Sequence, residues 1–93
     1  MSKKENPNAV YLGRAIACTR LERGMKRKDL VAAAGISYPF LAELENGHKW
    51  PSFVMLDRIA VALGVSSLYL FSRAKCISED FPVLQNATGA VQS

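Results

Sequence analysis

Residues 35–47, GISYPFLAELENG, decide the fold of this 93-residue chain. Gly35 allows a sharp turn, and Ser37 is a residue type that caps helices. Leu41 and Leu44 then recur at helical spacing, which predicts a short helix with an inward apolar face. The stretch is therefore a turn followed by a short helix, and other helices are needed to cover its apolar side.

The sequence on either side of this stretch predicts four more helices, marked by capping residues at their starts and glycines at their ends. One spans about residues 7–23 and another about residues 27–34, and two more follow Ser52 and Ser66. No segment of useful length alternates with period two, so we expect an all-α fold, a compact five-helix bundle. In addition to Leu41 and Leu44, we expect the following residues to face the core: Leu12, Ile16, Thr19, Phe40, Phe53, Leu56, Ile59, Ala60, Leu63, Leu70 and Phe71.

The composition is that of one ordinary small domain, with 49% hydrophobic and 22% charged residues. A net charge of +4 and an isoelectric point near 9.3 permit a nucleic acid as partner without establishing one. The polar start MSKKENPN is not followed by the apolar core of an export signal. No uncharged run approaches the roughly 20 residues of a membrane span, so we expect no membrane association.

The residues that could carry catalysis or bind a metal are few and poorly spaced. Cys18 and Cys76 lack metal-ligand spacing, and only His48 is available to join them. A disulfide between them is one alternative, but we expect free thiols in a cytoplasmic protein. There is no glycine-rich phosphate loop and no nucleophile beside His48, so we expect neither an enzyme nor a cofactor nor a metal.

A series of landmarks runs in order along about two-thirds of the chain. They are LGRAI at 12–16, Arg20, Gly24, Leu30, AAGIS at 33–37, LAELENG at 41–47, Pro51, LDRIAVALGVS at 56–66 and LYLF at 68–71. In these residues the chain resembles the XRE/Cro-type helix-turn-helix family of transcriptional regulators. The resemblance implies a lambda-repressor-like domain whose second and third helices form the motif. It also implies a homodimer on a two-fold operator in double-stranded DNA, with half-sites roughly 34 Å apart.

On this basis the chain divides into a flexible N-terminal arm at residues 1–8, the helix-turn-helix domain at 9–72 and a tail at 73–93. The helical pattern lapses from Arg73 onward, so we expect the tail to be either disordered or associated with a dimer partner. Apolar residues stand just before it where relatives tend to have polar ones, and we expect a dimer interface at Leu68, Tyr69 and Phe71. An apolar island at residues 81–84 could extend this interface. A satellite core contact within one monomer is the alternative.

The resemblance places Tyr38, Pro39, Ala42 and Glu43 at base-reading positions on the helix that would enter the major groove. If Ser37 caps this helix, Pro39 lies in its first turn, where a proline loses little. Pro39 and Ala42 offer apolar contact to a thymine methyl, and Tyr38 can reach a phosphate or stack on a base edge. Glu43 can accept a hydrogen bond from the N4 amine of cytosine. The alternative for Glu43 is an outward-facing residue that keeps the helix soluble.

Glu45 and Arg20 stand where the family has a structural ion pair. We therefore expect them to pair between the third and first helices, partly buried. Removal of one partner of such a pair typically costs about 3–5 kcal/mol, because the other charge is stranded. The alternative is two solvated surface charges, worth under about 1 kcal/mol.

The residues expected to hold phosphates flank the reading helix on both sides. They are Lys26, Arg27, Lys28, Ser37, Asn46, His48 and Lys49. The first three stand where free N–H groups and the helix dipole attract anions. Lys26 occupies the usual Ser or Thr capping position, so this helix start is expected to be less well satisfied. Such flanks can hold the duplex by its phosphates while a helix without Lys or Arg reads it. The alternative is a solvated charged face.

These observations predict a sequence-specific DNA-binding transcriptional regulator, a repressor that occupies a promoter as a homodimer. No small-molecule substrate is evident, and we expect the protein in the cytoplasm, associated with the nucleoid through DNA. The alternative function is a protein-interaction module that keeps the fold without reading DNA. An antitoxin subunit or a regulator of another repressor belongs to that class.

Overall fold

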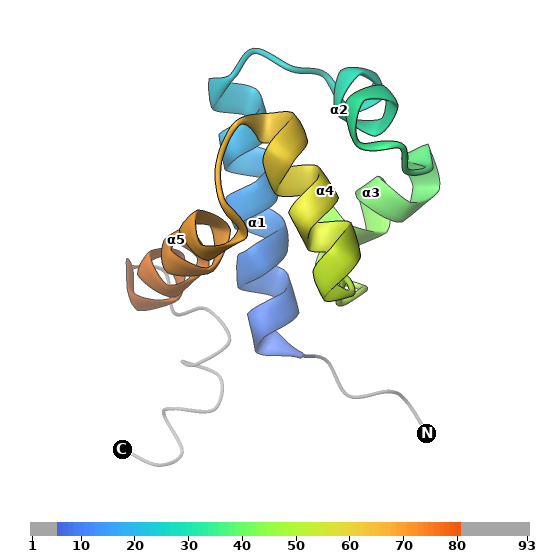
Figure 1. Ribbon diagram of the computed structural model, residues 1–93. Helices are drawn as coiled ribbons and strands as arrows, with labels where there is room; N and C mark the ends of the chain where they lie inside the picture. The colour runs from blue at the N-terminus through green and yellow to red at the C-terminus, as the bar shows by residue number, and fades with distance from the viewer. Residues whose placement is uncertain (1–5, 81–93) are drawn as a thin grey trace, which may run out of the picture.

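A computed structural model describes residues 6–80 and shows five helices joined by short loops (Figure 1). The helices are α1 (Pro7–Glu22), α2 (Arg27–Ala34), α3 (Tyr38–Glu45), α4 (Phe53–Leu63) and α5 (Ser67–Asp80). The predicted all-α, five-helix fold is thereby confirmed for the residues that the structure describes.

Polar side chains cap four of these helices, at the positions that the sequence predicts. Asn6 Oδ1 accepts a hydrogen bond from the Asn8 amide at 3.0 Å, and the Ser37 hydroxyl accepts one from the Phe40 amide at 3.2 Å. The hydroxyls of Ser52 and Ser66 cap α4 and α5 in the same way, at 3.1 and 3.0 Å. Each cap satisfies one of the backbone N–H groups that a helix start leaves without a partner.

The core lies between α1 and the four helices around it. Helix α1 packs against both α5 and α3, while α2 packs against α4 (Figure 1). Side chains that are at most 3% exposed form this core, namely Leu12, Ile16, Leu30, Leu41, Leu44, Leu56, Ile59, Ala60, Leu63 and Leu70 with Ala15 and Tyr11. Thr19 is buried with them because its hydroxyl donates to the carbonyl of Ala15 at 2.7 Å. Phe40 is half-buried and packs against the same core.

Gly13 allows α1 and α3 to cross closely. A Cβ atom at this position would overlap the carbonyl oxygen of Leu44 and come within 2.9 Å of that of Glu45. The close crossing brings the end of α3 against the middle of α1. Gly13 is thus required by packing rather than by backbone conformation.

Two aromatic residues predicted to face inward do not lie in the core. Phe53 is 71% exposed and Phe71 is 39% exposed. At 100° per residue, Phe53 lies roughly 70° from the centre of the buried stripe of α4, and Phe71 lies about 90° from that of α5. Both residues were predicted to be buried because they are hydrophobic. Their positions around the helix axis place them at the edge of the core instead.

Helix α5 continues through Asp80, so the predicted domain end at residue 72 falls inside a helix. Leu70 and Ala74 are buried and Ile77 packs against the core, and these three residues keep helical spacing. Arg73 and Lys75 interrupt the apolar pattern in the sequence without interrupting the helix. At the other end, α1 begins at Pro7, inside the predicted arm at 1–8. Residues 1–5, residues 81–93 and the apolar island at 81–84 lie outside the described residues.

Within residues 6–80, no single helix is long and apolar enough to cross a membrane. Helices α4 and α5 meet the criterion of length and composition only when taken together, as a pair bent by 92°. No cluster of three metal-ligating side chains occurs in the same part of the chain.

Candidate nucleic-acid interface

Helices α2 and α3 form a helix-turn-helix whose turn depends on Gly35. This residue has a φ of 70°, in the left-handed region that favours glycine. Figure 1 shows the two helices together on the side of the molecule away from α5. The turn leaves the outer side of α3 open while its inner side covers the core.

The four predicted base-reading residues share the solvent side of α3. Tyr38 is 49% exposed, Pro39 and Glu43 are exposed, and Ala42 is half-buried. They form two pairs at four-residue spacing, 38 with 42 and 39 with 43, so they lie on one surface. Pro39 lies in the first turn of the helix without interrupting it. The open side of α3 is therefore an almost uncharged surface with one carboxylate.

Glu45, at the end of the same helix, faces inward and joins three helices. Its carboxylate accepts from Arg20 Nε at 2.7 Å and from Arg20 Nη2 at 3.0 Å. The structure thus shows the pair that the resemblance implies, in a two-pronged arrangement. The side chains are 10% and 1% exposed for arginine and glutamate. Arg20 Nη1 also donates to the carbonyl of Met25 at 2.9 Å, which ties the loop before α2 to this pair.

Arg27 belongs to the same buried cluster. Its Nε donates to Glu45 Oε1 at 2.8 Å, and its side chain is 29% exposed. The hydrogen bond that Arg27 donates to Glu45, followed by a smaller contribution from a hydrogen bond with Tyr38, raises the pKa of the Arg27 guanidinium. This revises the predicted role of Arg27, because a guanidinium engaged with a buried carboxylate is not a free cation for phosphate. Two arginines share one glutamate, so the cluster keeps a net positive charge.

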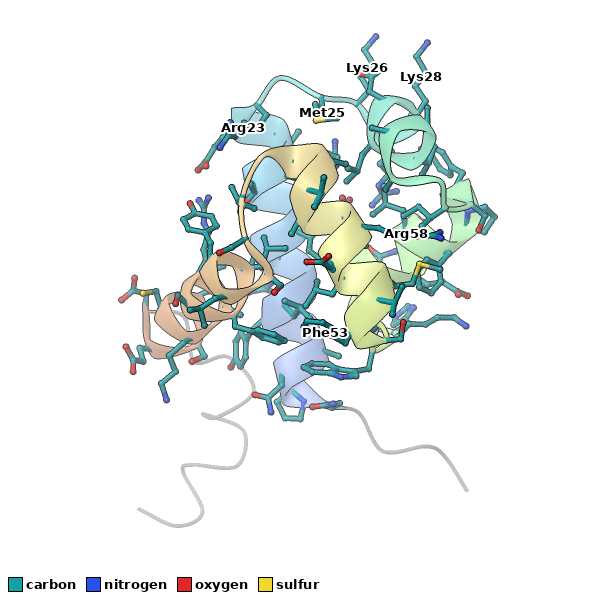
Figure 2. The ribbon with its side chains drawn as sticks, viewed as in Figure 1. Arg23, Met25, Lys26, Lys28, Phe53 and Arg58 are labelled. Atoms are coloured by element: carbon teal, nitrogen blue, oxygen red, sulfur yellow. The ribbon has the colours of Figure 1, made fainter. Side chains whose placement is uncertain are left out.

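The start of α2 carries two free lysines. Lys26 and Lys28 are exposed, and Figure 2 shows both pointing away from the protein at the same end of α2. Lys26 cannot cap the helix with its side chain, but its backbone amide donates to Asp29 Oδ2 at 2.8 Å. Asp29 was not singled out in the sequence, and it makes this helix start better satisfied than predicted. The two ammonium groups remain available to anions.

The loop after α3 carries the second group of predicted phosphate contacts. Asn46, His48 and Lys49 are all exposed. Lys49 Nζ lies 3.6 Å from Glu43 Oε1, and both side chains are about half exposed, at 48% and 49%. An ion pair in that environment is worth under about 1 kcal/mol and opens readily. Glu43 and Lys49 are therefore neighbours that can separate when another partner is offered.

Arg58 is a cation near the turn that the sequence analysis did not find. It projects from α4, and its Nη1 lies 4.0 Å from the point where a Cβ atom on Gly35 would stand. Figure 2 shows Arg58 extending from α4 toward the helix-turn-helix. The packing of α2 against α4 brings Arg58 close to Gly35. The spacing of residues along the sequence does not indicate this contact between separate helices.

The three residues predicted for a dimer interface do not share one surface of α5. Leu68 points away from the core and is 71% exposed. Tyr69 lies on one flank, where its hydroxyl contacts Arg73 Nη1 at 3.4 Å. Phe71 lies on the other flank, where its ring centroid is 6.3 Å from that of Trp50. Among these three residues, only Leu68 makes no such contact with another residue of the described range 6–80.

Comparison with known proteins agrees with this geometry. A helix-turn-helix family model matches residues 19–70, which include both helices of the motif and reach into α5. The chain belongs to the XRE/Cro-type helix-turn-helix family. This is a family of transcriptional regulators and not of enzymes.

Individual members of the helix-turn-helix family show the extent of the likeness. The chain is 43% identical over 47 residues to the HTH-type transcriptional regulator DdrOP3 of Deinococcus deserti, a match that covers 50% of this chain and 36% of that protein. It is 36% identical over 59 residues to the uncharacterized HTH-type transcriptional regulator y4dJ of Sinorhizobium fredii, a match that covers 63% of this chain and 77% of that protein. The crystal structure of the clp gene regulator ClgR from C. glutamicum is similar with a TM-score of 0.73 at 30% identity, covering 80% of this chain and 95% of that one. The chain thus spans about a third of DdrOP3 and most of the other two.

Proposed function

We propose that the protein is a sequence-specific double-stranded DNA-binding regulator that places α3 in the major groove. The observation that carries this proposal is the distribution of charge around α3. Its outer side has no Lys or Arg, whereas exposed cations stand at both ends of the motif. Lys26 and Lys28 lie on one side (Figure 2), and Lys49, in a weak ion pair with Glu43, lies on the other. A surface divided in this way suits a duplex held by its phosphates and read along its base edges.

The proposed phosphate contacts are the exposed polar groups at the two ends of the motif. They comprise Lys26, Lys28, Ser37, Asn46, His48 and Lys49, with Arg58 added from the structure. The Ser37 hydroxyl accepts its capping bond from the Phe40 amide and still has a proton to donate to a phosphate oxygen. Arg27 is left out, because Glu45 engages it.

The proposed base contacts depend on the release of Glu43 from Lys49. When Lys49 turns to a phosphate, the Glu43 carboxylate is freed to accept from the N4 amine of a cytosine. The carboxylate repels phosphates at other registers, so it disfavours most sequences and favours a few. Tyr38, Pro39 and Ala42 present apolar surface beside it, which suits a thymine methyl.

Three finer points belong to this proposal. A homodimer on a two-fold operator fits the exposed Leu68 of α5 together with Phe53 and Val61 of α4, which are 71%, 71% and 70% exposed. Repression by occupancy of a promoter is the proposed mode, because it needs DNA binding alone. This function is carried out in the cytoplasm, on the nucleoid.

Selection of duplexes from a random pool by the purified full chain tests the proposal. We expect recovered sequences with two-fold symmetry and half-sites about one helical turn apart. Glu43→Ala should change which bases are recovered, whereas Lys49→Ala should weaken all sites alike by about fivefold. An α5 lysine away from the motif, Lys75→Ala, serves as the control for general loss of charge. Recovery of no preferred sequence would favour the protein-interaction module instead.

A further inference from the structure

A pocket of about 510 Å³ lies away from the helix-turn-helix, between the first turns of α1, the loop before α4 and one side of α5. Its volume falls within the range of about 300–1,000 Å³ that is usual for small-molecule sites. The lining residues are Pro7, Asn8, Tyr11, Trp50, Phe71, Ala74, Lys75 and Ser78. None of them is among the proposed DNA contacts.

The Tyr11 hydroxyl distinguishes this pocket from an ordinary surface depression. Tyr11 is 3% exposed, and its hydroxyl is buried without a hydrogen-bond partner among residues 6–80. Such a group is disfavoured in a folded protein unless something pairs with it, and buried tyrosine hydroxyls usually find a partner. Because Tyr11 lines the pocket, a ligand that displaces the side chains covering the hydroxyl can supply that partner.

The remaining walls define the chemistry of the ligand. Trp50 and Phe71 present two aromatic rings whose planes are tilted by 32°, and these favour a flat apolar body. Lys75 is the one charged residue in the lining. Its Nζ is 3.9 Å from Glu79 Oε2, and the two side chains are 74% and 63% exposed, so this pair is weak and yields to a better placed anion.

We propose that this pocket binds a small aromatic monocarboxylate. The aromatic ring of the ligand contacts Trp50 and Phe71, its carboxylate pairs with Lys75, and one of its oxygens accepts a hydrogen bond from the Tyr11 hydroxyl. Each of these three contacts uses a group in the pocket that has no role in the proposed DNA binding. The site is separate from the proposed DNA interface.

Trp50 makes the proposal directly measurable, because it is the single tryptophan of the chain. The probe is 3-phenylpropionate, titrated into the full-length protein without DNA while the fluorescence of Trp50 is followed. We expect a saturable change with a dissociation constant of roughly millimolar or tighter, as suits a ligand of this size. The uncharged 3-phenylpropionamide should bind about fivefold more weakly, since it cannot pair with Lys75.

Two variants with matched controls separate the contacts. Lys75→Ala should abolish the difference between the acid and the amide. Tyr11→Phe should weaken binding of the acid by about three- to tenfold while the unliganded protein keeps its thermal stability or gains some. Tyr69→Phe removes a hydroxyl on the opposite flank of α5 and should leave the affinity for the acid unchanged.

Each contrary outcome overturns the proposal. A linear, non-saturable response, or equal affinity for acid and amide, would show that the pocket has no carboxylate site. Binding by Phe81→Asp but not by the natural chain would show that residues 81–93 occupy the pocket. Binding that appears only on dilution would assign the pocket to a second copy of the chain. Because no DNA is present, failure here leaves the DNA-binding proposal untouched.

Discussion

At Glu45 a single carboxylate accepts hydrogen bonds from two arginines, one on α1 and one on α2. The carboxylate is 1% exposed, so water cannot replace either partner. The cluster fixes the end of α3 against the two helices that precede it. The orientation of the proposed base-reading surface therefore depends on a buried residue outside it.

Glu45→Gln should lower the free energy of unfolding by about 3 kcal/mol, because it leaves the Arg20 guanidinium buried without its counter-charge. The partial exposure of Arg27 sets this value at the lower end of the usual range of about 3–5 kcal/mol. Urea denaturation of the natural chain and of Glu45→Gln measures this difference in the free energy of unfolding. Glu43→Gln, a change of the same kind at an exposed position, is the control and should cost under about 1 kcal/mol. Equal effects of the two variants would contradict the structural role of Glu45.

Glu22 gives the fold a dependence on pH. The hydrogen bond from Arg73 lowers the pKa of the Glu22 carboxyl, and Arg73 Nη1 lies 2.6 Å from Glu22 Oε1. A group whose pKa is depressed on folding stabilises above its unfolded pKa, and this stabilisation is lost as pH falls through the folded pKa.

Thermal unfolding of Glu22→Gln across pH checks this linkage. The natural chain should be more stable than the variant at about pH 6–7, and the two melting temperatures should converge as pH falls below about 4. Asp57→Asn, at another exposed acid, is the control and should show no such convergence. A constant difference between the natural chain and Glu22→Gln down to acidic pH would rule the linkage out.

At the scale of elements, Gly13 is the clearest case in which packing overrides helix propensity. Glycine inside a helix is normally about 1 kcal/mol worse than alanine. Gly13→Ala should nevertheless destabilise the protein by about 1–3 kcal/mol or more, because the new Cβ meets the Leu44 carbonyl oxygen at the α1–α3 crossing. Chemical denaturation shows whether Gly13→Ala lowers or raises the free energy of unfolding. Arg14→Ala, at the exposed neighbouring position, is the control. A stabilised Gly13→Ala would mean that α1 and α3 are further apart than described.

Helix starts and the helix-turn-helix could be predicted because the signals for them are local. Ser37, Ser52 and Ser66 cap within three residues of their own position, and Gly35 determines its turn by its own φ. The end of α5 could not be predicted in this way. Polar residues after Phe71 hid the apolar positions 74 and 77, which are held by α1 rather than by their neighbours in sequence.

At the scale of the whole molecule, the sequence predicted which residues surround α3. It did not predict which of them pair within the protein and which stay exposed to solvent. Arg27 pairs with Glu45 and Arg58 approaches Gly35 only because distant helices pack together. The same packing leaves the Tyr11 hydroxyl in a pocket that no spacing in the sequence indicates. The base-reading and phosphate-binding roles remain predictions.

On the proposed function, exposed cations at both ends of the motif hold the duplex while the outer side of α3, whose one charged group is Glu43, reads it. Titration of the full chain with a selected duplex and a random-sequence duplex, over a series of salt concentrations, tests this claim most directly. With six to ten phosphate contacts in a dimer, we expect affinity to fall by about 10³–10⁵-fold between about 50 and about 200 mM salt. The selected duplex should be preferred at every concentration. Affinity that does not change with salt, or equal affinity for both duplexes, would contradict the claim.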